Sequence, residues 1–120
     1  MTKPRLVCVV DDDESIRRSL ENLLASVGIE VRTFASAEDY LRSDALDTTD
    51  CLILDFVLAG MNGLELLQRL KTMQRPIVVV MLTAHDDGDV QRQALSSGAR
   101  AFLTKPLDAC ELMSIMRTMV

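Results

Sequence analysis

Apolar residues follow two alternating patterns along this chain. Continuous apolar runs, such as residues 6–10 and 77–82, are typical of parallel strands that are covered on both faces. Between the runs, apolar residues recur at helical spacing. In the first such segment these are Ile16, Leu20, Leu23, Leu24 and Val27. Gly28 follows this segment and is a natural helix stop.

The remaining strands are weaker versions of the same signal. Residues 29–34 alternate in the manner of a more exposed strand, residues 51–54 form a third apolar run, and residues 101–103 form a short last strand.

The remaining helices are marked by caps and apolar stripes. Ser36 with Asp39 predicts the start of a short helix that ends near Arg42, and Asp108 with Glu111 predicts the start of the last helix. Apolar stripes indicate three longer helices, the first after Gly63 and the second ending at Gly98. Their apolar positions are Leu64, Leu67 and Leu70; Val90, Ala94 and Leu95; and Leu112, Ile115, Met116 and Met119.

This alternation of strands and helices predicts an α/β fold with a parallel sheet and helices on both faces. Two strand orders are open for such a sheet, and the flavodoxin-like order 2-1-3-4-5 suits five strands. We therefore expect residues 1–120 to form one flavodoxin-like (βα)5 domain. In either order, ligands bind outside the carboxyl ends of the strands.

Four of the five predicted strands are followed by polar residues with chemistry of interest, whereas the second strand is followed by the unremarkable Ala35 and Ser36. These polar ends are residues 11–14 (Asp-Asp-Asp-Glu), Asp55, residues 83–85 (Thr-Ala-His) and residues 104–106 (Thr-Lys-Pro). Because parallel strands share one carboxyl edge, these groups can converge on a single pocket.

The residue types at these ends favour phosphoryl transfer. Clustered carboxylates resist ionisation unless a cation joins them, and oxygen ligands with room for water favour magnesium. Asp11 and Asp12 are the candidate metal-binding pair, and Asp55 is the candidate nucleophile. The Thr83 hydroxyl and the Lys105 cation could then bind the phosphoryl oxygens.

Each of these residues also has an ordinary structural explanation. Asp12 or Asp13 could cap the first helix, and Asp55 could be a turn residue. Thr83 could pack as a strand residue, and Lys105 could lie on the surface. Separate structural roles do not explain why all four residues follow strands, so the set as a whole favours a shared functional site.

Composition removes several other functions. The net charge of −5 disfavours direct nucleic-acid binding. The three cysteines are widely spaced without a CxxC pair, so we expect reduced, mostly buried thiols. The apolar runs are too short to cross a bilayer, and the N-terminus lacks a secretory pattern, so we expect no membrane association and a cytoplasmic location.

The chain resembles the receiver domain of bacterial two-component response regulators, the CheY-like group. The resemblance rests on residues 10–13 (Val-Asp-Asp-Asp), Leu54-Asp55 with Gly63 eight residues on, residues 82–84 (Leu-Thr-Ala) and Lys105-Pro106. These motifs occur in the family's order and spacing and cover essentially the whole chain.

The resemblance implies a role for each site residue. Asp55 would accept a phosphoryl group from a phosphohistidine of a sensor histidine kinase or phosphotransfer protein. Magnesium would be held by Asp11, Asp12, Asp55 and the backbone carbonyl of Val57. Lys105 would contact the phosphoryl group.

The resemblance also implies a conformational switch. The hydroxyl of Thr83 would move toward the phosphoryl group, and Phe102 would turn inward with it. Phe102 can equally be a packed core aromatic, and both interpretations stay open. The Lys105-Pro106 peptide bond would be cis. The signal would leave through the face made by the fourth helix, the fifth strand and the fifth helix, through which we also expect dimerisation on phosphorylation.

The chain departs from the family in the loop after Asp55. Family members usually carry proline at the position of Ala59, so this loop is expected to be less rigid here. In the family, the positions of Val57 and His85 help to set how long the phosphoryl group survives. Apolar Val57 should position an attacking water poorly, which predicts slow self-dephosphorylation.

Three other functions are alternatives to a phosphorylated receiver domain. A flavin-binding protein would need aromatic residues, but the chain has no Trp and one Tyr. A magnesium-dependent phosphatase would usually need a general acid at the position of Val57. A receiver-like protein-binding module that is never phosphorylated remains the main alternative. The stretch of residues 102–106 also resembles regulators with a helix-turn-helix output domain, so such a domain could follow Val120.

Overall fold

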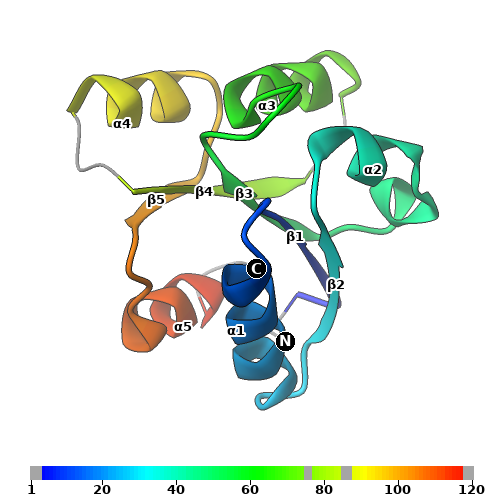
Figure 1. Ribbon diagram of the computed structural model, residues 1–120, viewed down its shortest axis with the longest axis vertical. Helices are drawn as coiled ribbons and strands as arrows, with labels where there is room; N and C mark the ends of the chain where they lie inside the picture. The colour runs from blue at the N-terminus through cyan, green and yellow to red at the C-terminus, as the bar shows by residue number, and fades with distance from the viewer. Residues whose placement is uncertain (1–3, 75–76, 85–87, 118–120) are drawn as a thin grey trace.

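Five parallel strands form a single sheet in the computed structural model, which describes residues 4–74, 77–84 and 88–117. The strand order is β2-β1-β3-β4-β5, as predicted (Figure 1). The strands are β1 (Leu6–Val10), β2 (Glu30–Phe34), β3 (Cys51–Asp55), β4 (Val78–Thr83) and β5 (Ala101–Thr104). The central strands β1 and β3 are fully buried, whereas β2 at the edge is half-exposed, in agreement with its alternating sequence.

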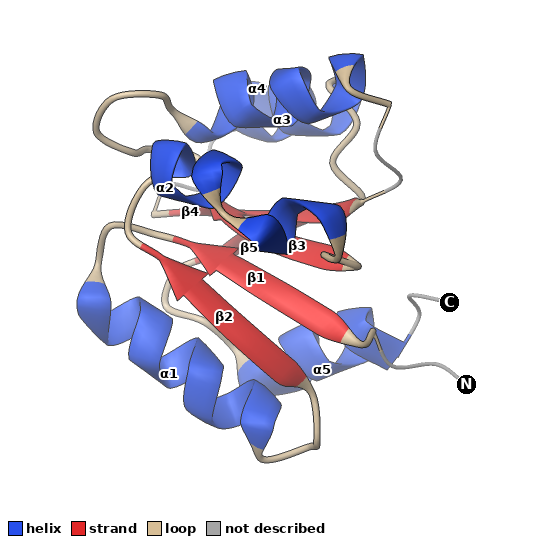
Figure 2. Cartoon of the chain, turned by 90° about the vertical axis from the view of Figure 1, so that its right-hand side faces the viewer, coloured by secondary structure: helices blue, strands red, loops and turns tan. Residues whose placement is uncertain are grey.

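Helices cover both faces of the sheet (Figures 1 and 2). One face carries α1 (Glu14–Ala25) and α5 (Ala109–Arg117), and the other carries α2 (Ala37–Arg42), α3 (Gly63–Thr72) and α4 (Gly88–Ser96). No helix among the described residues is long and apolar enough to cross a membrane.

Two apolar clusters, one on each face, hold these layers together. Alternate residues of each strand point to opposite faces, so Val7 and Val9 pack with α1 and α5, while Cys8 and Val10 pack with the other helices. Burial of two such clusters is the main stabilising term for a sheet of this kind.

The helix starts predicted from the sequence carry the expected caps. Asp13 accepts a hydrogen bond from the Ser15 amide at 2.9 Å and caps α1, so the structural explanation holds for this aspartate. Ser36 caps α2 through the Asp39 amide, and Asp108 accepts from two amides at the start of α5. A capping box at the start of α3, Asn62 with Glu65, was not predicted.

Three strands extend one residue further than the sequence pattern indicated: β5 includes Thr104, and the other two end in site residues. The third strand was predicted to end at Leu54 and the fourth at Leu82, but β3 includes Asp55 and β4 includes Thr83. Both polar residues are therefore held by strand backbone. A short 3-10 helix, η1 (Asp44–Asp47), was also not predicted. Met119 of the last predicted helix lies outside the described residues.

Candidate functional site

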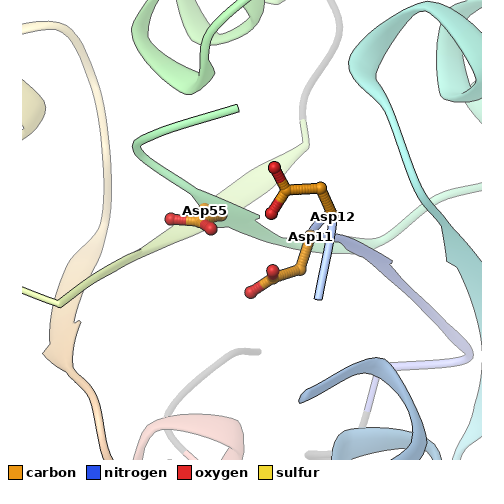
Figure 3. Close-up of side chains that lie close together, drawn as sticks. All are labelled: Asp11, Asp12 and Asp55. Carbon is orange, nitrogen blue, oxygen red and sulfur yellow. The ribbon is translucent and has the colours of Figure 1, made fainter. Parts of the chain in front are cut away.

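Three carboxylates converge at the carboxyl edge of the sheet (Figure 3). Val10 and Leu54 are register partners in the neighbouring strands β1 and β3, so the next residues, Asp11 and Asp55, lie side by side. One carboxylate oxygen from each of Asp11, Asp12 and Asp55 falls within 4.8 Å of the others. Asp11 and Asp55 are buried, and Asp12 is exposed at the mouth of the site.

Lys105 bridges the two buried carboxylates. Its Nζ atom donates a hydrogen bond to Oδ2 of Asp55 at 3.2 Å and lies 3.0 Å from Oδ2 of Asp11. Asp11 Oδ2 is fully buried, yet it accepts no well-formed hydrogen bond from the described residues. This oxygen therefore retains bonding capacity for another positive group.

The electrostatics of the site are dominated by excess negative charge. Burial raises the pKa of Asp55, and the neighbouring charge of Asp11 raises it further, although the Val57 amide and Lys105 act in the opposite direction. Burial lowers the pKa of Lys105, but Asp11 and Asp55 more than offset this effect and the net shift is upward. Lys105 thus stays charged and only partly neutralises the carboxylates.

The donor set fits a hard divalent cation. All the side-chain ligands offered are carboxylate oxygens, which suit magnesium, and the exposed Asp12 leaves one side of the site open to water. The buried Asp11 oxygen without a hydrogen bond and the raised pKa of Asp55 are both features that a bound cation would relieve.

Thr83 ends β4 beside this acidic group. Its neighbour Leu82 is the register partner of Asp55, and its own register partner is Thr104 in β5. The Thr83 side chain is buried, and its backbone carbonyl accepts a hydrogen bond from the Lys105 amide at 2.7 Å. The Lys105-Pro106 bond is cis, as expected from the resemblance.

The loop after Asp55 is fastened by contacts at several points. The Val57 amide donates to Oδ1 of Asp55 at 3.2 Å, while the Val57 side chain is 62% exposed. Leu58 is buried in the apolar cluster under α2, α3 and α4. The Gly63 amide closes the loop by donating to the Phe56 carbonyl at 3.1 Å.

Two residues near the site were not found by sequence reasoning. Arg17 of α1 donates to the backbone carbonyl of Asp11 at 2.7 Å, and Glu38 of α2 accepts from the Met61 amide at 2.9 Å. No local pattern marks Glu38, because its partner lies 23 residues further along the chain.

The expected switch residue Phe102 and the expected modulating residue His85 have different outcomes. Phe102 pairs with Met81 and is half-buried against the apolar cluster on the α2, α3 and α4 face. It is therefore packed against the core without being enclosed by it. His85 lies outside the described residues.

A doubly wound parallel sheet with buried carboxylates, a lysine and a threonine at its carboxyl edge defines a class of acidic-pocket α/β domains. The chain belongs to the response regulator receiver domain family, whose model matches residues 7–117.

Relatives and solved structures agree with this assignment. The chain is 43% identical over 108 residues to Nodulation protein W of Bradyrhizobium diazoefficiens, covering 90% of this chain and 48% of that protein. It is 39% identical over 111 residues to the DNA-binding transcriptional regulator NtrC of Escherichia coli, covering 92% of this chain and 24% of that protein. The structure of response regulator StyR has a TM-score of 0.87 at 39% identity, with 98% of this chain and 59% of that chain covered.

Another solved chain matches this fold over nearly all of its length. The chemotaxis protein CheY4 of Vibrio cholerae has a TM-score of 0.87 at 25% identity, with 96% of this chain and 98% of that chain covered. By contrast, the chain spans between a quarter and about half of the curated relatives named above.

Proposed function

We propose that this receiver domain accepts a phosphoryl group on Asp55 from a phosphohistidine of a sensor histidine kinase or phosphotransfer protein. The observation that carries the proposal is the setting of Asp55: a strand-end carboxylate, 6% exposed, with Lys105 bonded to it and Asp11 beside it. A structural aspartate would not need a buried second carboxylate next to it, because that neighbour raises its pKa.

The reaction is a direct transfer between two side chains. An Asp55 carboxylate oxygen attacks phosphorus, the new O–P bond forms as the P–N bond breaks, and the imidazole nitrogen keeps the electron pair of the broken bond. Lys105 stabilises the negative charge on the phosphoryl oxygens, and the Thr83 hydroxyl donates a hydrogen bond to one of them. The domain would thus catalyse its own phosphorylation and, slowly, its own dephosphorylation.

Asp11, Asp12, Asp55 and the Val57 carbonyl would hold the magnesium ion that this reaction requires. When bound, the ion would neutralise charge on the carboxylates and on the phosphoryl oxygens. The protein groups do the positioning: Asp11 is fixed by the Arg17 contact to its carbonyl, and Asp55 by the Val57 amide.

The output would leave through α4, β5 and α5. Phosphorylation adds about 1.5 to 2 negative charges and new acceptor oxygens beside Thr83 and Lys105, so it favours one of two pre-existing arrangements of the loops after β4 and β5. This face would mediate dimerisation, and it would control an output domain in a longer protein or a separate partner. Sedimentation of the phosphorylated and unphosphorylated domain tests dimerisation. The proposal predicts a species of dimer size only after phosphorylation.

The phosphoacceptor is tested directly by intact mass. The protein is incubated with magnesium and a small acyl-phosphate donor, alongside Asp55→Asn and the exposed control Asp47→Asn. A phosphate-sized gain that needs Asp55 and magnesium, and that persists in Asp47→Asn, supports the proposal. Absence of any gain in the wild-type protein would favour the alternative, a receiver-like binding module that is not phosphorylated.

A further inference from the structure

Glu38 ties α2 to the loop that follows the phosphoacceptor. Glu38 lies in the first turn of α2, and its Oε2 atom accepts a hydrogen bond from the Met61 amide at 2.9 Å. Met61 is half-buried and packs against the same apolar cluster as Leu58. The contact therefore joins α2 to the loop after Asp55, although the two residues are 23 positions apart in the sequence.

The loop is shaped to receive this carboxylate. Gly60 has a φ of 74°, and a Cβ atom at this position would lie 2.8 Å from Glu38 Oε2. Any other residue would thus meet both backbone strain and the carboxylate. The glycine and the glutamate are complementary parts of one contact.

The same loop carries groups that act on Asp55. The Val57 amide is bonded to Asp55 Oδ1, and the Val57 carbonyl is the proposed backbone ligand of the cation. The Gly63 amide donates to the Phe56 carbonyl and so joins the two ends of the loop. Leu58, in the middle of the loop, is buried in the core. Glu38 adds a charge-assisted bond to the Met61 amide of the same loop.

We propose that Glu38 is a positioning residue that fixes this loop, and with it Val57, for cation binding and phosphoryl transfer at Asp55. The effect on phosphoryl transfer rests on the proposed function, whereas the contact between Glu38 and the loop is independent of it. The Met61 amide also lowers the pKa of Glu38, so the carboxylate stays ionised at neutral pH.

Three variants separate this role from a general loss of charge. Glu38→Ala removes the acceptor, Glu38→Gln keeps an oxygen that can accept from the Met61 amide, and Asp39→Ala removes a carboxylate from the same helix without touching the loop. Glu38→Ala should bind magnesium about tenfold more weakly by calorimetry, as is typical when a partner supporting a metal site is lost. Glu38→Gln should retain most of the affinity, and Asp39→Ala should match the wild-type protein.

Two further measurements report on the mechanism of the effect. Hydrogen exchange at the Met61 amide, measured without metal or phosphate donor, should be faster in Glu38→Ala and near normal in Glu38→Gln. The rate of phosphorylation by the acyl-phosphate donor should fall in Glu38→Ala at low magnesium and recover at saturating magnesium. Unchanged magnesium affinity in Glu38→Ala, or an equal loss in Asp39→Ala, would overturn the inference.

Gly60→Ala provides an independent test of the same contact. It should weaken magnesium binding by itself, and in the Glu38→Ala background it should weaken it by less, because the clash with the carboxylate is gone. Fully additive losses would contradict the shared contact. If the wild-type protein gains no phosphate, the proposed function fails, yet the exchange and magnesium measurements still decide whether Glu38 positions the loop.

Discussion

Gly63 lies so close to Asp55 that a Cβ atom at Gly63 would fall 2.2 Å from the Asp55 carbonyl oxygen and 3.0 Å from the Phe56 Cα. The first residue of α3 thus packs directly on the backbone that carries the phosphoacceptor. The spacing between Asp55 and Gly63 supported the family resemblance, and this contact supplies a physical reason for the glycine: there is no room for a side chain.

Gly63→Ala should therefore destabilise the domain by at least about 2 kcal/mol, because backbone atoms on both sides cannot move away cheaply. Gly88→Ala is the matched control, since a Cβ at Gly88 would meet only the flexible end of Arg92, at 3.3 Å. The free energy of unfolding by urea is the measurement, with the control expected within about 0.5 kcal/mol of wild type. Equal stability of the two variants would contradict this prediction, because it would show that the backbone at Asp55 and Phe56 can shift to make room for the added Cβ atom.

Lys105→Met should slow phosphorylation of Asp55 by about a hundredfold, a typical loss when one group that stabilises developing charge is removed. The lysine lies 3.0 Å from Asp11 Oδ2 and 3.2 Å from Asp55 Oδ2, so its loss also leaves two buried carboxylates without their cation. The initial rate of mass gain with the acyl-phosphate donor measures the effect, and Lys71→Met on the exposed face of α3 is the control. A Lys105→Met rate equal to that of Lys71→Met would contradict the assigned role.

The part of the site that sequence could predict is the part set by strand ends. Asp11, Asp55, Thr83 and Lys105 each follow or end an apolar run, and the carboxyl edges of parallel strands must meet. The order of strands and helices along the sequence therefore predicts that these residues lie close together. The contacts of Lys105 with Asp11 and Asp55 agree with that expectation.

The part that sequence could not predict depends on contacts between elements. Glu38 lies on a short polar helix, and nothing near it in the sequence points to Met61. The η1 helix was missed for a similar reason: it is held by Thr49, whose buried hydroxyl donates to the Ala45 carbonyl and accepts from Tyr40. Such side-chain bonds leave no periodic pattern along the chain.

The three thiols should differ sharply in reactivity. Burial raises the pKa of Cys8 and of Cys51, whereas Cys110 is exposed. A raised pKa means less thiolate at any given pH, and burial also blocks access. Native protein treated with iodoacetamide at about pH 8 should gain one label, on Cys110, and raising the pH to about 9 should still spare the other two.

Unfolding in urea should expose all three thiols to labelling. Native Cys110→Ser is the control and should take up no label. Rapid labelling of Cys8 or Cys51 in the folded protein would show that the sheet opens far more readily than two fully buried strands allow.

Val57→Asn should shorten the lifetime of the phosphorylated state. The Val57 side chain is 62% exposed next to the site, while its backbone amide is bonded to Asp55, so the substitution changes the side chain without removing that contact. Valine cannot hydrogen-bond a water molecule, whereas an asparagine amide can orient one for attack on the acyl phosphate. The decay of the phosphorylated mass after removal of the donor is the measurement. Val57→Leu keeps an apolar side chain and should decay at the wild-type rate; an unchanged lifetime in Val57→Asn, or equal acceleration in Val57→Leu, would exclude this role for the side chain.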